Sequence, residues 1–263
     1  MNLNDFLSKH AVFTVEELDR FLSERGTANR NTRKALLSYH LRKGHIVRIR
    51  RGLYAAVNRG SDPSSTPSDP FLVAAKVTCD SVLAYHTALE FHGKAYTVFS
   101  RLSCTSMSKS LPVRLGGYEI KCVPVPESLR AKGQTMFGVD TFYRSGVQVK
   151  VTNLERTFVD VLDRPELSGS WEEIWRSLET IEFLDLDQVI EYAYLLENST
   201  TAAKAGFFLE QHKETLMARE EHLESLRKLC PRQPHYIERT KRRHSRWMKE
   251  WNLMVPDELL RAS

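Results

Sequence analysis

The sequence lacks the features of a membrane, secreted or disulfide-rich protein. None of its apolar runs approaches the roughly 18 residues that a transmembrane helix needs. An acid, Asp5, stands near the N-terminus, where a signal peptide would carry basic residues and then an apolar stretch. The four cysteines are widely spaced, form no CxxC pair and have no histidine at zinc-binding spacing. We therefore expect a cytoplasmic protein with reduced thiols, no disulfide framework and no structural zinc.

Motifs for enzymatic chemistry are equally scarce. The sequence contains no Gly-rich phosphate loop, nucleophile elbow or kinase signature. His86 and His92 are six residues apart, a spacing that does not place both on one helix face, and we expect His86 in the core. The sequence thus predicts a protein that is not an enzyme and that uses no cofactor and no metal.

Charge, in contrast, is present and unevenly distributed. Residues 1–60 carry twelve Lys and Arg against five Asp and Glu, a net charge of +7. Residues 151–210 carry four basic and thirteen acidic residues, a net charge of −9. Such asymmetry indicates a polyanionic partner for the N-terminal part only.

Local signals in the first sixty residues predict a winged helix-turn-helix. Thr14 and Glu17 have the spacing of a capping box that opens a helix, and Gly26 is a typical helix stop. A second helix begins at Asn29 or Asn31 and continues to Gly44. Two short strands follow, residues 45–49 and 53–57, and helix, turn, helix, hairpin is the order of this DNA-binding module.

The second helix, residues 30–43, is the candidate recognition helix. Helical spacing places Leu36, Leu37, His40 and Leu41 on the core-facing side. The opposite side is polar and suits base reading in a major groove; it comprises Asn31, Ser38, Tyr39 and Arg42. Strand alternation places Arg48 and Arg50 on one face of the hairpin. Arg30, Arg33 and Lys34 in the first turn are assigned to phosphates, and Lys43 is a further candidate DNA contact. The hairpin arginines, Arg48, Arg50 and Arg51, either grip the phosphate backbone or enter the minor groove.

Beyond this module the pattern changes twice. Residues 61–70 are rich in Pro and Ser and predict a linker, and residues 70–92 predict a helical stretch that ends at Gly93. Short β-rich runs occupy 95–151, and a second capping box, Thr152 to Glu155, opens a helical region that reaches about Leu229. The prediction is an α+β protein: a winged helix-turn-helix at 1–60, a linker at 61–70, a larger α+β domain at 71–230 and a basic, less regular tail at 231–263.

Three blocks, taken in order, resemble the AbiEi-type antitoxins of type IV toxin–antitoxin systems. They are the wing-like run 44–54, the segments 69–71 and 84–93, and the run 151–166. The resemblance implies a phage-defence regulator that binds inverted repeats in its own promoter and represses its own operon. It also implies a C-terminal domain that counteracts a cognate nucleotidyltransferase-like toxin without forming a stable complex with it.

Other interpretations remain open. Glu119 and Lys121 lie in a strand-like segment with the acid-x-Lys spacing of a PD-(D/E)xK-like nuclease, which would need Asp80 or Glu90 to help hold magnesium. An effector-responsive repressor is a further alternative. The helix that contains Glu155, Arg156 and Asp160 has a structural interpretation, in which these charges pair within a scaffold. The basic tail either adds nonspecific nucleic-acid contacts or packs against the acidic region.

Overall fold

The structure is a computed structural model that describes residues 3–26, 29–57, 69–238 and 244–260. The chain divides into two compact units that alternate along the sequence. The first comprises Met1–Leu83, Phe99–Pro124 and Thr141–Val151, and the second comprises Ala84–Val98, Val125–Asp140 and Thr152–Ser263. The predicted α+β class is confirmed. Residues 61–68 of the predicted linker lie outside the described residues, and the predicted domain boundaries stay predictions.

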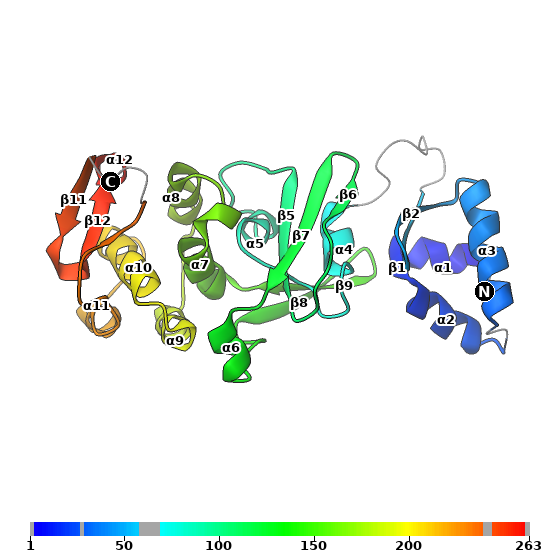
Figure 1. Ribbon diagram of the computed structural model, residues 1–263, viewed down its shortest axis with the longest axis horizontal. Coiled ribbons are helices and arrows are strands. Elements are labelled where there is room, and N and C mark those ends of the chain that lie inside the picture. The colour runs from blue at the N-terminus through cyan, green and yellow to red at the C-terminus, as the bar shows by residue number, and fades with distance from the viewer. Residues whose placement is uncertain (1–2, 27–28, 58–68, 239–243, 261–263) are drawn as a thin grey trace. The chain divides into compact units, whose positions relative to one another are not determined.

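The N-terminal module has the helix and strand order of a winged helix. Its capping box is confirmed, because the Thr14 side chain accepts from Glu17 N at 3.3 Å and the Glu17 carboxylate accepts from Thr14 N at 2.8 Å. A three-stranded sheet in the order β1-β3-β2 closes the module. Strand β1 was not predicted, since three residues are too few for a periodic pattern. The elements are α1 (Leu3–Lys9), β1 (Val12–Thr14), α2 (Val15–Ser23), α3 (Arg30–Arg42), β2 (Ile46–Arg50) and β3 (Leu53–Ala56) (Figure 1).

A mixed six-stranded sheet forms the β-rich middle of the chain, as the sequence predicted for residues 95–151. Its strand order is β6-β7-β5-β4-β9-β8. Strand β5 runs parallel to β7 and antiparallel to β4, while β4 runs parallel to β9. The strands are β4 (Val82–Leu83), β5 (Arg101–Ser106), β6 (Val113–Leu115), β7 (Tyr118–Pro124), β8 (Val139–Arg144) and β9 (Val147–Thr152).

The predicted helical stretch 70–92 is wrong as a continuous element. It consists of α4 (Pro70–Ala75), the strand β4 and α5 (His86–Phe91). Tyr85, which is buried, has a φ of +59°, a value outside the range of residues in a right-handed α-helix. The apolar residues of this stretch therefore enter the core from three elements, although their spacing is compatible with one helix. Gly93, with a φ of +69°, does end α5 as predicted.

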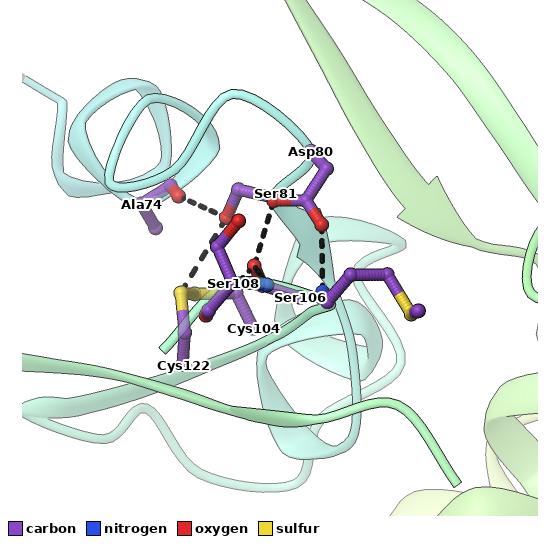
Figure 2. The surroundings of a disulfide bond; sticks show 8 residues. Ala74, Asp80, Ser81, Cys104, Ser106, Ser108 and Cys122 are labelled. Carbon is purple, nitrogen blue, oxygen red and sulfur yellow. Dashed lines mark hydrogen bonds between the residues drawn. A yellow bond between two sulfur atoms is a disulfide. The ribbon is translucent and has the colours of Figure 1, made fainter. Parts of the chain in front are cut away.

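A disulfide joins Cys104 of β5 to Cys122 of β7, so the expectation of reduced thiols is wrong for this pair. The parallel register places the two residues opposite each other, with Cα atoms 4.4 Å apart. Cys79 and Cys230 are free. Figure 2 shows the bridge beside Ser81, whose hydroxyl donates to Ala74 O at 2.7 Å. The pairing depends on the register of β5 and β7. This register cannot be inferred from the 18-residue separation of the two cysteines in the sequence.

The second unit is mainly helical, as predicted. The predicted capping box at Thr152 is wrong by one residue: Asn153 is the N-cap of α7, and its side chain accepts from Arg156 N at 3.0 Å. Glu155 instead accepts from Asp185 N at 3.1 Å. The helices are α6 (Glu127–Ala131), α7 (Leu154–Asp163), α8 (Trp171–Glu179), α9 (Leu186–Leu196), α10 (Ser199–Gln211) and α11 (Glu220–Arg227).

The C-terminal segment is more regular than the sequence indicated. Trp251 is buried and its indole N–H donates to Glu210 of α10 at 2.7 Å. A Cβ atom on Gly206 would lie 2.0 Å from the Trp251 ring, so α10 requires glycine at this contact. The described part of the segment thus belongs to the helical core and is not a loose tail. Its elements are β10 (His235–Tyr236), β11 (Ser245–Met248), β12 (Leu253–Pro256) and α12 (Asp257–Leu260).

Two buried polar groups bear out structural interpretations made from the sequence. His86 is buried, and its ring nitrogens lie 2.9 Å from Glu90 and 3.0 Å from Glu173, so it is a core histidine with partners on both sides. Arg156 and Asp160 are also buried and form an ion pair at 3.3 Å within α7. The charges of this helix therefore support the scaffold.

Candidate nucleic-acid interface

Helix α3 (Figure 1) carries the residues predicted to read DNA. Both of its ends are fixed by local interactions. The side chain of Asn29 caps the helix by accepting a hydrogen bond from Asn31 N at 2.8 Å. The helix ends at Arg42, and Gly44, with a φ of +69°, leads the chain towards β2. Asn29, and not Asn31, is therefore the cap.

The two faces of α3 lie as the helical spacing predicted. On the inner face, Leu36, Leu37 and Leu41 pack on the core of the module, and His40 is buried. That core includes Phe6, Phe13, Leu18, Leu22, Ile46 and Tyr54. The outer face is exposed and comprises Asn31, Ser38, Arg42 and Tyr39, the last with 47% of its surface accessible. The side chains assigned to base reading are thus presented together to solvent.

The cations along α3 fall into two groups. Arg30, Lys34 and Lys43 are exposed. Arg33 is half-buried and forms an ion pair with Asp19 of α2. It therefore links the two helices of the helix-turn-helix, and its charge is compensated before any DNA is bound.

The β2–β3 hairpin carries the other predicted cations at its tip. Arg48 and Arg51 are exposed, and Arg50 is half-buried. The register pairs Arg48 with Tyr54 but Arg50 with Leu53, so β2 contains one extra residue. Strand alternation, from which Arg48 and Arg50 were placed on one face, is interrupted at this bulge.

A histidine pair links the end of α3 to the residue that precedes β2, and the sequence pattern did not indicate it. His40 Nδ1 and His45 Nδ1 are 3.2 Å apart. Burial, together with the nearby charge of His45, lowers the pKa of His40. His40 is therefore neutral at physiological pH and adds no cation to the interface. The placement of His40 on the core stripe was the signal available in the sequence.

The residues of the nuclease alternative have other partners. Glu119 forms ion pairs with Arg101 at 3.6 Å and Arg114 at 3.4 Å. Asp80 accepts hydrogen bonds from the Ser106 hydroxyl and from Met107 N. Burial raises the pKa of Asp80, but these hydrogen bonds outweigh it and the net shift is downward.

The third nuclease candidate, Glu90, lies against His86 in the second unit, and Lys121 is exposed. Within the described part of the chain, no group of three or more His, Cys, Asp or Glu is arranged to hold a metal ion.

A cavity of about 530 Å³ lies in the second unit, lined by Trp171, Trp175, Pro256 and Leu259 among others. This volume is in the range of small-molecule sites. The effector-responsive alternative therefore stays a prediction.

No helix in the described residues is both long and apolar enough to cross a membrane.

A capped helix-turn-helix, a bulged basic hairpin and a polar outer helix face together give the N-terminal module the architecture of a winged helix. Residues 1–57 match the family model described as a transcriptional regulator, AbiEi antitoxin. The resemblance is therefore confirmed for this part of the chain, which includes the wing-like run 44–54. The other two blocks of the resemblance lie outside the matched residues.

Comparison with solved structures gives the fold of the whole chain. The crystal structure of the RV2827C protein from Mycobacterium tuberculosis is similar, with a TM-score of 0.58 and 17% sequence identity. The match covers 99% of this chain and 92% of that protein. At this identity the likeness concerns the fold alone. No curated protein matches the sequence.

Proposed function

We propose that this chain is a DNA-binding transcriptional autorepressor and the antitoxin of a type IV toxin–antitoxin system. It acts in the cytoplasm and binds inverted repeats in double-stranded DNA of its own promoter. It counteracts a cognate nucleotidyltransferase-like toxin without forming a stable complex, and it uses neither a catalytic reaction nor a cofactor. The antitoxin part rests on the family match over residues 1–57 and on the resemblance of the later blocks.

The DNA-binding part of the proposal rests on one observation. The exposed polar face of α3 is followed directly in the sequence by the basic β2–β3 hairpin. Asn31 suits adenine and Arg42 suits guanine, since their side chains match the hydrogen-bonding edges of these bases. Ser38 is small enough to permit close approach to the groove. Arg50 and Arg51 lie on the hairpin and not on the outer face of α3, so we assign them to phosphate contacts.

The double variant Arg50→Ala, Arg51→Ala is expected to weaken binding to all DNA sequences alike. Each phosphate contact contributes about 0.9 to the slope of log affinity against log salt, so the slope should flatten by about 1–2. Arg42→Ala should instead reduce discrimination between operator and random DNA by about 1–3 kcal/mol. Fluorescence anisotropy titrations at several salt concentrations measure both effects.

A matched control removes the same charge elsewhere in the module. Lys9 and Arg20 are exposed on α1 and α2, and neither is assigned a DNA contact. The variant Lys9→Ala, Arg20→Ala should keep the slope and the discrimination of the unmodified protein. If the hairpin and Arg42 variants also bind like the unmodified protein, the proposed interface is wrong. The antitoxin part would be abandoned if neither a nucleotidyltransferase-like gene nor upstream inverted repeats flank this gene.

A further inference from the structure

A second group of cations lies in the first unit, on the loop that joins β5 to β6 and on β6 itself. Lys109 and Arg114 line a depression of about 630 Å³, together with Arg50 and Arg51 of the hairpin. All four belong to the same compact unit. None of the described residues that line this depression is acidic. Nothing in the sequence pattern singles out Lys109 or Arg114.

The start of this loop is held in place by Asp80. Its carboxylate accepts from the Ser106 hydroxyl at 2.7 Å and from Met107 N at 2.6 Å (Figure 2). The Ser106 oxygen accepts in turn from Ser108 N at 2.9 Å. These bonds fix the chain immediately before Lys109. The loop is therefore already ordered at this point and loses less conformational entropy on binding.

The loop also offers hydroxyl groups beside its charges. Ser108 and Ser110 both line the depression. The hydroxyl of Ser110 is shielded from solvent and has no hydrogen-bond partner among the described residues. A hydroxyl without a partner is a donor that an oxygen ligand satisfies once the serine side chain rotates towards the depression.

Arg114 remains available despite its ion pair. Its side chain is 85% exposed, and the contact with Glu119 is 3.4 Å long. Exposed pairs of this kind contribute little, so a phosphate can replace Glu119 at small cost. Cations combined with hydroxyl donors match the oxygen atoms of a phosphodiester.

We propose that Lys109, Arg114 and Ser110 form a second phosphate-binding site for the DNA that the winged helix binds. The proposal rests on the proposed function, because it uses the same DNA. Continuity with Arg50 and Arg51 favours the DNA backbone as the occupant, since these arginines are already assigned to phosphates. The protein then contacts DNA from both its winged helix and its sheet.

The test uses the full chain, a duplex from the region upstream of its gene and a shuffled duplex of equal length. The variant Lys109→Ala, Arg114→Ala is expected to flatten the salt slope by about 1–2 on both duplexes, because two phosphate contacts are lost. The ratio of affinities for the two duplexes should not change. Both side chains are exposed, so the thermal melting curve should match that of the unmodified protein.

The control variant Arg130→Ala, Lys228→Ala removes two exposed cations from the second unit and should leave the slope unchanged. A flattened slope for the loop variant alone supports the second site. If the unmodified protein and the hairpin variant behave as proposed but the loop variant keeps the full slope, this inference is overturned and the proposed function stands. If the unmodified protein does not bind DNA, the proposed function itself fails.

Discussion

Replacing Arg156 by alanine is expected to lower the free energy of unfolding by about 3–5 kcal/mol, because it leaves a buried carboxylate without its cation. Arg156 is 1% exposed, and its guanidinium donates to Asp160 at 3.3 Å and to the backbone oxygens of Thr135 at 3.0 Å and Phe137 at 2.7 Å. Tyr192 donates to the other oxygen of Asp160 at 2.5 Å. The substitution therefore breaks a network and not a single contact.

The buried position of Asp160 explains why the effect should be large. Burial raises the pKa of this carboxyl, even though Arg156 and Tyr192 favour its charged form. Without Arg156 the carboxylate loses its main compensating charge. Two backbone oxygens also lose their donor, which adds to the cost.

A more exposed pair of similar spacing supplies the control. Arg176 and Glu179 lie on α8 at 3.3 Å, and the Arg176 side chain is 47% exposed. Arg176→Ala should therefore cost less than about 1 kcal/mol. Urea unfolding of both variants, followed by circular dichroism, gives the comparison. An Arg156→Ala protein that is as stable as the Arg176→Ala protein would contradict the scaffold interpretation of α7.

Reduction of the Cys104–Cys122 disulfide is the second prediction with a large expected effect. The bridge spans 18 residues, and chain-entropy arguments give about 3 kcal/mol for a loop of this size. The oxidised protein should therefore be more stable than the reduced protein by about this amount. The bridge acts mainly on the unfolded chain, because it keeps the segments of β5 and β7 from separating in that state.

The measurement is best made on the variant Cys79→Ser, Cys230→Ser, which lacks the two free thiols. Urea unfolding is then compared with and without a dithiol reductant, and thiol labelling counts the cysteines that react. Equal stability of the two forms would show that the bridge does not constrain the unfolded chain as expected. Cytosolic reductants keep most thiols reduced, so the ease with which this disulfide is reduced also tests the predicted cytoplasmic location.

The sequence predicted the parts of the fold that short-range chemistry determines. The Thr14 and Glu17 capping box, the glycine stops at Gly26 and Gly44 and the buried stripe of α3 depend on residues within one or two turns of each other. The outer face of α3 followed from the same periodicity. The main features of the candidate interface were therefore available from the sequence.

The features that were missed depend on contacts between distant segments. The Arg33 and Asp19 pair, the bulge after Arg48 and the strand β1 require the packing of elements that local patterns do not place. The opposition of Cys104 and Cys122 is set by strand register. Helix spacing at 70–92 was ambiguous because short apolar runs fit a helix or a buried strand equally well.

The most direct test of DNA-binding regulation is an anisotropy titration of the unmodified chain. One duplex carries the region upstream of its gene, and the other has the same bases in shuffled order. We expect the upstream duplex to bind at least about 10³-fold more tightly near physiological salt, as specific regulators do, with affinity that falls as salt rises. Equal affinity for the two duplexes, or no binding to either, would contradict the account.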